Sequence, residues 1–217
     1  MKRLFIKFTH RFKDNPKKTI FSSFNWFIRI PYYYLLYPII LSQNVFKTNR
    51  YKISELSKDL DVLIVSPGGV ATTFLLRYVS TFMKTNDIHD LDGLKHITPA
   101  PEFNFRKDLK VVYLTGELSD IENSLVKRGW LFEQYIKLGG HLHYFCNSKK
   151  LRSHFKVLVS GQLKTFKTLS KNNENVMIIN YNELWDLKKE LANFLSLDPQ
   201  NFVKAFPEKR SRALLPY

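Results

Sequence analysis

The sequence contains very little cysteine: Cys146 is the only one among 217 residues. One cysteine can form no intramolecular disulfide, and it cannot supply the several thiolates of a cysteine-rich metal site. A disulfide-stapled scaffold and a zinc-ribbon type of fold are therefore excluded. The composition favours a reducing compartment, and we expect the protein to be cytoplasmic.

Acidic residues are scarce at the start of the chain. Residues 1–50 hold ten Lys and Arg but a single acid, Asp14, which gives a net charge of +9 out of +15 for the whole chain. Together with Trp and Tyr, this charge suits a segment that lies on an anionic membrane surface. We expect no nucleic acid as a partner, because the rest of the chain carries no RNA-binding signature.

The chain also lacks a long uninterrupted apolar run. The most apolar stretch, Phe24–Leu41, is barely long enough to span a bilayer and is interrupted by Arg29, Pro31 and Pro38. A membrane-surface segment and a helix packed on the domain are equally good interpretations, and a transmembrane span ranks third. We predict a basic, aromatic arm over residues 1–50 and an α/β domain over residues 51–217, with peripheral binding at the inner face of the membrane as one role for the arm.

A Walker-type lysine is missing from the stretch Asp61–Val79, DVLIVSPGGVATTFLLRYV. Its apolar start, Val62–Val65, predicts a buried parallel strand, and the residues after the glycines predict a helix. A strand, a glycine turn and a helix N-terminus present free N–H groups to an anion, although an ordinary turn has the same residues. The expected anion-binding residues are Gly68, Gly69, Val70, Ala71, Thr72 and Thr73.

Two more apolar runs, Lys110–Leu114 and Val176–Tyr181, predict further buried strands of the same sheet. Gly139-Gly140 is a plausible helix stop. Helices are expected over 118–127 (with Ser119 and Glu122 as a capping box) and onward to 140, over 148–171 as a Lys-rich amphipathic helix, and over 182–197. The order of elements predicts an α/β fold with a parallel sheet.

His96 lies between the first two predicted strands, in a loop that can face the same crevice as the glycine turn. An imidazole titrates near neutrality and can accept a proton from a hydroxyl group, although a single histidine is often structural. His141 and His143 could share one face of a strand, but no carboxylate stands nearby. We therefore expect no metal site.

Several of these segments resemble the motifs of sulfotransferases that use 3′-phosphoadenosine 5′-phosphosulfate (PAPS). PGGVATTF is similar to the family's P-[KR]-S-G-T-T-W loop without its basic residue, and Lys95-His96-Ile97-Thr98-Pro99 is similar to K-T-H-x-P. Asp120 and Ser124 keep the spacing of R-x-P-x-D-x-x-x-S, with Gly116 in place of its Arg. YNEL at 181–184 followed by FLSL resembles Y-E-D-L and F-L-G, and Lys209, Arg210 and Arg212 fall where the family has a basic segment.

The resemblance implies a three-layer parallel sheet with helices on both faces, of the P-loop type found in sulfotransferases and nucleotide kinases. It implies transfer of a sulfuryl group from PAPS to a hydroxyl of an acceptor, for which a carbohydrate is one candidate. His96 would be the base and Lys95 would neutralise the sulfuryl oxygens. Ser124 would hold the 3′-phosphate with Arg210 or Arg212, or with the nearby Lys127 or Arg128. The alternatives are a P-loop enzyme such as a small-molecule kinase, and a non-catalytic, membrane-associated protein of the same fold.

Overall fold

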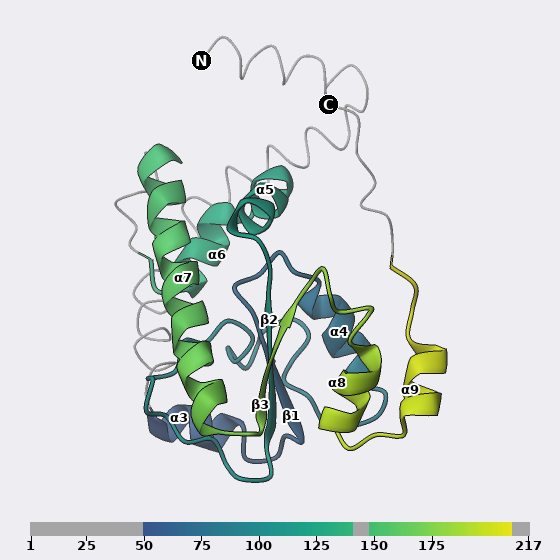
Figure 1. The fold of residues 1–217 in the computed structure, drawn as a ribbon. Helices are drawn as coiled ribbons and strands as arrows, with labels where there is room; N and C mark the ends of the chain where they lie inside the picture. The colour runs from purple at the N-terminus through teal and green to yellow at the C-terminus, as the bar shows by residue number, and fades with distance from the viewer. Residues whose placement is uncertain (1–49, 141–147, 210–217) are drawn as a thin grey trace. The chain divides into compact units, whose positions relative to one another are not determined.

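A computed structural model describes residues 50–140 and 148–209 (Figure 1), all of which belong to one compact unit, Gln43–Tyr217. The expectations for the arm up to residue 49, for His141 and His143, and for Arg210 and Arg212 lie outside these ranges. Within the two ranges, no helix has the length and apolar character needed to cross a membrane.

The centre of the fold is a parallel sheet of three strands in the order β1-β2-β3, formed by Val62–Val65, Lys110–Thr115 and Val176–Asn180. Val62 pairs with Lys110, and Val111 pairs with Val176. Every residue of β1 is buried, as expected for a short aliphatic strand covered on both faces. The three predicted strands and the α/β class are thereby confirmed.

The outer edge of β1 is closed by a side chain. The Asn86 amide accepts a hydrogen bond from the Ile64 N–H at 2.8 Å and donates to the Ile64 carbonyl at 3.1 Å. Thr85 forms an isolated parallel bridge with Val62. Asn86 therefore satisfies backbone groups that an edge strand would otherwise expose.

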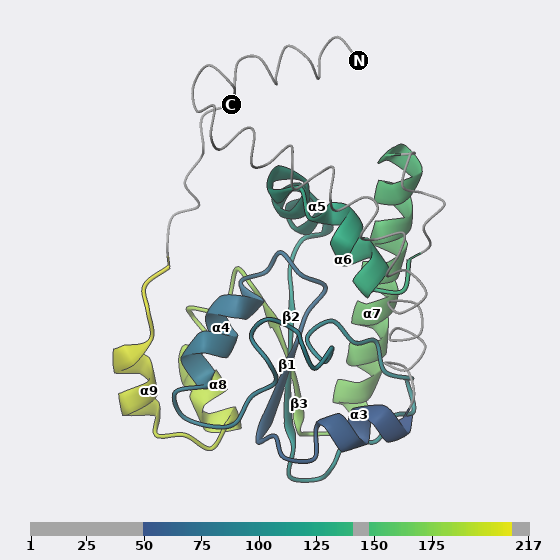
Figure 2. The same cartoon turned by 180° about the vertical axis from the view of Figure 1, so that it is seen from behind.

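Helices lie on both sides of the sheet, with α3 and α7 on one side and α4, α8 and α9 on the other (Figures 1 and 2). On the α7 side, Tyr113 of β2 stacks on Phe166 of α7 with ring centroids 4.3 Å apart. The helices are α3 (Arg50–Leu56), α4 (Thr72–Val79), α5 (Leu118–Arg128), α6 (Leu131–Lys137), α7 (Ser148–Asn172), α8 (Lys188–Phe194) and α9 (Pro199–Ala205).

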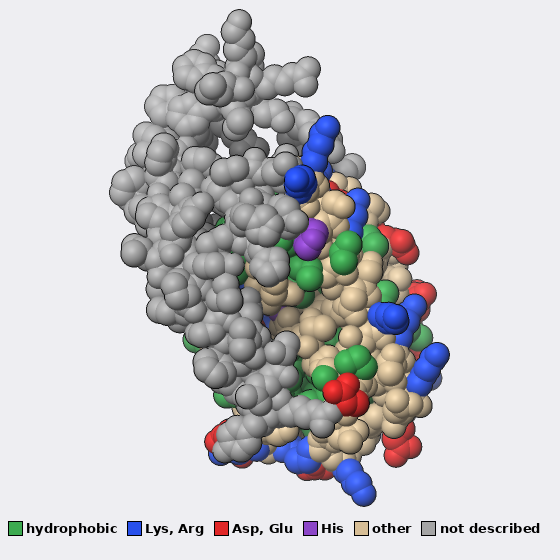
Figure 3. All heavy atoms as spheres, turned by 90° about the vertical axis from the view of Figure 1, so that its left-hand side faces the viewer, with side chains coloured by type: hydrophobic (Ala, Val, Ile, Leu, Met, Phe, Trp, Pro, Cys, Tyr) green, Lys and Arg blue, Asp and Glu red, His purple; other side chains and the backbone are tan. Residues whose placement is uncertain are grey.

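Helix α7 confirms the predicted Lys-rich amphipathic helix. Phe155, Val159 and Phe166 are buried beneath it, whereas lysines such as Lys156 and Lys164 are exposed. On this side of the molecule, basic and acidic side chains are scattered over the described surface and form no single-sign patch (Figure 3). The charges of α7 are therefore those of an ordinary solvated helix face.

Helix α4 is held against the C-terminal part of the chain by aromatic contacts. The Tyr78 hydroxyl donates to the Phe202 carbonyl at 2.5 Å, and the two rings meet edge to face. Phe74, in the first turn of α4, stacks on Trp185, whose indole N–H donates to the Pro207 carbonyl. These contacts fix α4, and with it the glycine turn at its start.

Three helix predictions were wrong in detail. The helix expected to run from 118 to 140 is divided, because Gly129 takes a left-handed conformation (φ +70°) that ends α5. The capping box is absent: Glu117 precedes α5 without a side-chain cap, and Glu122 instead pairs with Arg152 and Lys156 of α7. The helix expected over 182–197 is reduced to α8, preceded by turns.

Candidate functional site

The loop between β1 and α4, residues 66–71, is compressed between two other helices. Gly68 and Gly69 have φ of +91° and +77°, a region that favours glycine. A Cβ on Gly68 would lie 2.8 Å from Cδ of Gln134 in α6, and one on Gly69 would lie 3.2 Å from the carbonyl oxygen of Ile121 in α5. Both glycines are therefore required by conformation and by close packing.

Three consecutive backbone donors of the loop lack an acceptor in the described part of the chain. Helix α4 starts after Ala71, which is left-handed (φ 58°) and provides no side-chain cap. The first N–H groups of a helix have no acceptor within it. In the described part of the chain, no acceptor lies within hydrogen-bonding geometry of the N–H groups of Gly69, Val70 or Ala71. An anion could be bound by these donors together.

Ser66 engages two of the groups that were predicted to bind the anion. Its hydroxyl accepts a hydrogen bond from the Gly68 N–H at 3.1 Å and lies 2.5 Å from the Thr72 hydroxyl. Thr72 is buried, so its hydroxyl organises the loop from within. Thr73 is exposed, and of the two threonines it is the one whose side chain faces outward.

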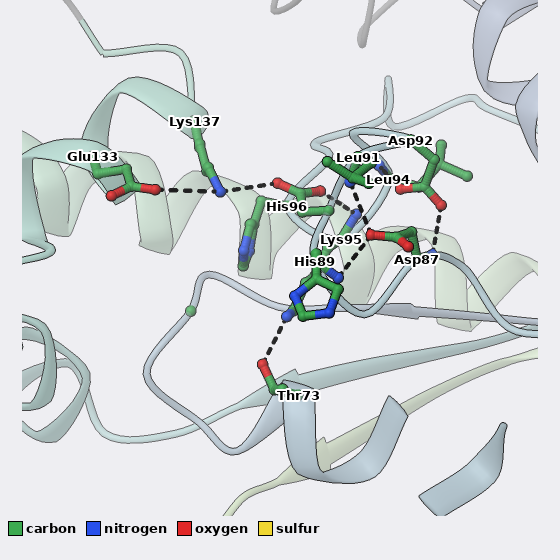
Figure 4. Close-up of polar contacts among 12 residues, drawn as sticks. Thr73, Asp87, His89, Leu91, Asp92, Leu94, Lys95, His96, Glu133 and Lys137 are labelled. Carbon is green, nitrogen blue, oxygen red and sulfur yellow. Dashed lines mark hydrogen bonds and ion pairs between the residues drawn. The ribbon is translucent and has the colours of Figure 1, made fainter. Parts of the chain in front are cut away.

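Lys95 brings a positive charge to the first turn of α4. Its Nζ donates to the Thr73 hydroxyl at 2.8 Å and to the Ile88 carbonyl at 2.9 Å (Figure 4). Burial lowers the pKa of Lys95, and the carboxylate of Asp90 opposes this effect. The loop lacks a basic residue of its own, and Lys95 places one beside it from a distant part of the sequence.

His96 is tied to the same loop from the other side. Its Nδ1 lies 2.7 Å from the Ser66 carbonyl oxygen, which can only accept, so Nδ1 carries the proton and Nε2 has the lone pair. The side chain is only 6% exposed. Burial lowers the pKa of His96 to about 4, against a weaker opposite effect of Asp90, so the ring is neutral at pH 7.

Three aspartates shape the segment that carries Lys95 and His96. Asp90, at a left-handed position, accepts a hydrogen bond from the Lys95 N–H at 3.1 Å and pairs with Nζ of Lys137 in α6 at 3.2 Å (Figure 4). Asp87 and Asp92 accept hydrogen bonds from local backbone N–H groups; the donors are His89 and Leu91 for Asp87, and Asp87 and Leu94 for Asp92. The segment is thereby held in one conformation.

Gln162 of α7 supports this segment from behind. Its amide donates to the Ile97 carbonyl at 2.7 Å and accepts a hydrogen bond from the Tyr113 hydroxyl at 3.1 Å. Gln162 is fully buried, so both halves of its amide need these partners. The backbone at His96 and Ile97 is therefore held by Gln162 of α7, and the imidazole of His96 is held by the Ser66 carbonyl of the loop.

Ser124 lies on α5 beside Arg128. The Ser124 hydroxyl accepts a hydrogen bond from Nη2 of Arg128 at 2.9 Å, and the guanidinium also stacks on Trp130 at 4.8 Å. Gly116, which stands where the motif has an Arg, packs closely: a Cβ there would lie 3.2 Å from Cγ1 of Val70. Among the described residues, Arg128 is thus the basic side chain that lies against Ser124.

Toward the C-terminus, the described chain ends with a basic side chain on an aromatic ring. The ammonium of Lys209 lies 5.4 Å from the ring centroid of Trp185. No group of three or more His, Cys, Asp or Glu in the described ranges could hold a metal ion.

The structure brings together the loop, Lys95 and His96, as predicted from the sequence. It adds Ser66, Asp90, Gln134 and Lys137, which the sequence reasoning missed. For Gln134 a signal existed: it lies on the apolar stripe formed by Leu131, Tyr135 and Leu138, where a polar residue is unexpected. The others are surface-type residues with no distinguishing pattern.

Comparisons with protein-family models, with curated proteins and with solved structures found no significant match. The function must therefore be argued from the residues of the site.

Proposed function

We propose that this chain is a PAPS-dependent sulfotransferase with a P-loop type of three-layer fold. The observation that carries the proposal is the hydrogen bond between Lys95 Nζ and the Thr73 hydroxyl. It places a cation beside the loop whose Gly69, Val70 and Ala71 N–H groups have no acceptor among the described residues. The cation belongs to the residue next to a neutral histidine. Sulfuryl transfer requires groups that bind an anionic leaving group, a cation near the charged transferred group, and a base for the acceptor.

In this proposal, the loop binds the 5′-phosphosulfate through backbone N–H groups of residues 69–73 and the Thr73 hydroxyl. Lys95 neutralises charge on the sulfuryl oxygens and on the departing phosphate, where charge increases as the bond breaks. Fixed donors in a buried site stabilise such charge more strongly than water does. No metal is required for this electrostatic role.

His96 would accept the proton of the acceptor hydroxyl through Nε2. The oxygen of the acceptor forms the new S–O bond, the bond between sulfur and the bridging oxygen breaks, and 3′-phosphoadenosine 5′-phosphate (PAP) leaves. An imidazole with a pKa of about 4 is a weak base, but an anion bound beside it raises that pKa toward neutrality. The acceptor, for which a carbohydrate is one candidate, must reach a nearly buried ring.

For the 3′-phosphate, Ser124 and Arg128 are the strongest candidates among the described residues, because they already share a hydrogen bond on one face of α5. A guanidinium can bind phosphate with two parallel hydrogen bonds. Arg210 and Arg212 remain predictions from the sequence.

Calorimetric titration of the full chain with PAP, AMP and ATP tests the proposal. We expect PAP to bind tightest, and we expect His96→Ala to lower kcat for PAP release from PAPS by about 100-fold or more while PAP binding is kept. His89→Ala is the matched control, because His89 is an exposed histidine of the same segment.

Each competing function has its own outcome in this experiment. Tighter binding of ATP than of PAP would support a small-molecule kinase. Absence of binding by all three nucleotides would support a non-catalytic protein of the same fold. Unchanged turnover of His96→Ala would remove His96 from the mechanism.

A further inference from the structure

Two glutamines are buried in the described structure, and they differ in their hydrogen bonding. Gln162 satisfies both halves of its amide. Gln134 is 7% exposed, and its Nε2 is buried without a hydrogen-bond partner. A buried, unpaired donor is costly and rare in folded proteins, so it calls for an explanation.

Gln134 lies directly against the anion-binding loop. A Cβ on Gly68 would meet Cδ of Gln134 at 2.8 Å and Oε1 at 3.0 Å. Because Gly68 has no side chain, the amide of Gln134 can pack onto the backbone of the loop. The unpaired Nε2 therefore belongs to a side chain that packs on Gly68, next to the three N–H groups (Gly69, Val70 and Ala71) that have no acceptor in the described part of the chain.

The same helix touches the site a second time. Lys137 follows Gln134 by three residues, so the two share one face of α6. Its ammonium pairs with Asp90, which also holds the backbone of Lys95 (Figure 4). Helix α6 thus contacts both the loop and the segment of Lys95 and His96, and it forms a wall of the site.

We propose that Gln134 is an anion-binding residue, whose Nε2 donates a hydrogen bond to an oxygen of the oxyanion held by the backbone N–H groups of residues 69–73. The chemical class of the ligand is a phosphate or sulfate group. That this group belongs to PAPS rests on the proposed function, but the contact itself requires only a tetrahedral oxyanion. The amide contributes a neutral donor, which fixes the position of an oxygen without adding charge.

Gln134→Met tests the proposal, because methionine keeps the length and volume of the side chain and removes its donor. We expect the affinity for PAP, measured by calorimetry on the full chain, to fall about tenfold or more. The free energy of unfolding should not fall, since the variant removes an unpaired group. Gln200→Met, the same change at an exposed position of α9, is the control and should bind PAP as the wild type does.

Gln134→Glu provides a second variant in case the methionine variant folds poorly. It keeps the shape and replaces the donor with a carboxylate, so anion affinity should fall further than in Gln134→Met. An unaltered PAP affinity in both variants would overturn the proposal and would assign Nε2 to a structural water.

Titration with inorganic sulfate at constant ionic strength separates this inference from the proposed function. If sulfate binds in a Gln134-dependent manner but PAP is not preferred over AMP, the anion contact stands and the sulfotransferase proposal fails. If PAP is preferred and binds equally well to Gln134→Met, the proposed function stands and the inference fails. If the wild type binds neither ligand, both fail.

Discussion

At the scale of single residues, the charge at the first turn of α4 comes from Lys95, which follows Thr73 by 22 positions. Its ammonium is nearly buried, and burial lowers its pKa. Two neutral oxygens and the nearby Asp90 only partly replace the lost hydration. A bound oxyanion would supply a full counter-charge. An ammonium group whose lost hydration is only partly replaced is therefore suited to binding an anionic ligand.

We expect His96 to make the free energy of unfolding depend on pH. Its folded pKa of about 4 lies below the ordinary 6.5, so the unfolded state binds more protons between these two values. The stability that this pKa shift contributes is therefore fully present above pH 6.5, and it is lost as the pH falls toward 4. At pH 5 we expect a loss of about 2 kcal/mol from this residue, measured as the difference in urea unfolding free energy between pH 7 and pH 5.

His96→Asn is the variant for this measurement, because an amide N–H can replace Nδ1 as the donor to the Ser66 carbonyl. It should show a smaller decrease of unfolding free energy between pH 7 and pH 5, by about 2 kcal/mol. An equal decrease in both proteins would mean that His96 is protonated without penalty, and thus that the ring is more hydrated than the structure indicates.

The sequence predicted that His96, with Lys95 beside it, lies in a loop between the first two strands that can face the same crevice as the glycine turn and Thr73. It did not predict which groups remain available. The Gly68 N–H and the Thr72 hydroxyl are occupied by Ser66, an interaction that depends on the exact turn of the backbone. Nor did it predict Gln134, because the contact with Gly68 depends on how α6 packs over a loop more than sixty residues earlier in the chain.

At the scale of elements, glycine decides where two of the helices end or continue. Gly129 is left-handed and ends α5, whereas Gly161 lies inside the 25-residue helix α7. Nothing lies within 4 Å of a Cβ built on either one, so substitution changes only the backbone preference. The two positions therefore form a matched pair.

We expect the same substitution to have opposite effects at these two positions. Gly129→Ala should destabilise the protein by about 1 kcal/mol, because alanine resists a left-handed conformation. Gly161→Ala should stabilise it by about 0.5–1 kcal/mol, because alanine favours a helix interior. Urea unfolding measures both, with the slope unchanged. Effects of the same sign would show that the division between α5 and α6 is not set by Gly129.

The strands were predictable because β1, β2 and β3 are short aliphatic runs with breaking residues after them. The helix boundaries were harder to predict from the sequence. Gly129 and Gly161 look alike in sequence, and burial distinguishes them: α7 continues past Gly161 because Phe155 and Phe166 on either side of it are both in the core. The end of α5 at Gly129 allows α6 to take a different direction, in which Gln134 packs on Gly68 of the loop.

At the scale of the whole molecule, charge is divided unevenly along the chain. Residues 1–50 carry +9, whereas the rest of the chain carries +6. The described surface on the α7 side mixes both signs, so it offers no strong single-sign field (Figure 3). Because more than half of the net charge lies in residues 1–50, we expect attraction to a large anionic surface to depend on the arm.

This leads to a prediction for membrane binding. The full chain should co-sediment with vesicles that contain phosphatidylserine and not with neutral phosphatidylcholine vesicles, since each basic residue near such a surface contributes about 1 kcal/mol. Binding should weaken as salt is raised, because screening shortens the reach of the charges to about 10 Å at 0.1 M.

A variant lacking residues 1–42 keeps the compact unit Gln43–Tyr217 and loses eight of the ten basic residues of the arm. It should stay in the supernatant; sedimentation equal to that of the full chain would assign membrane binding to another surface or to none.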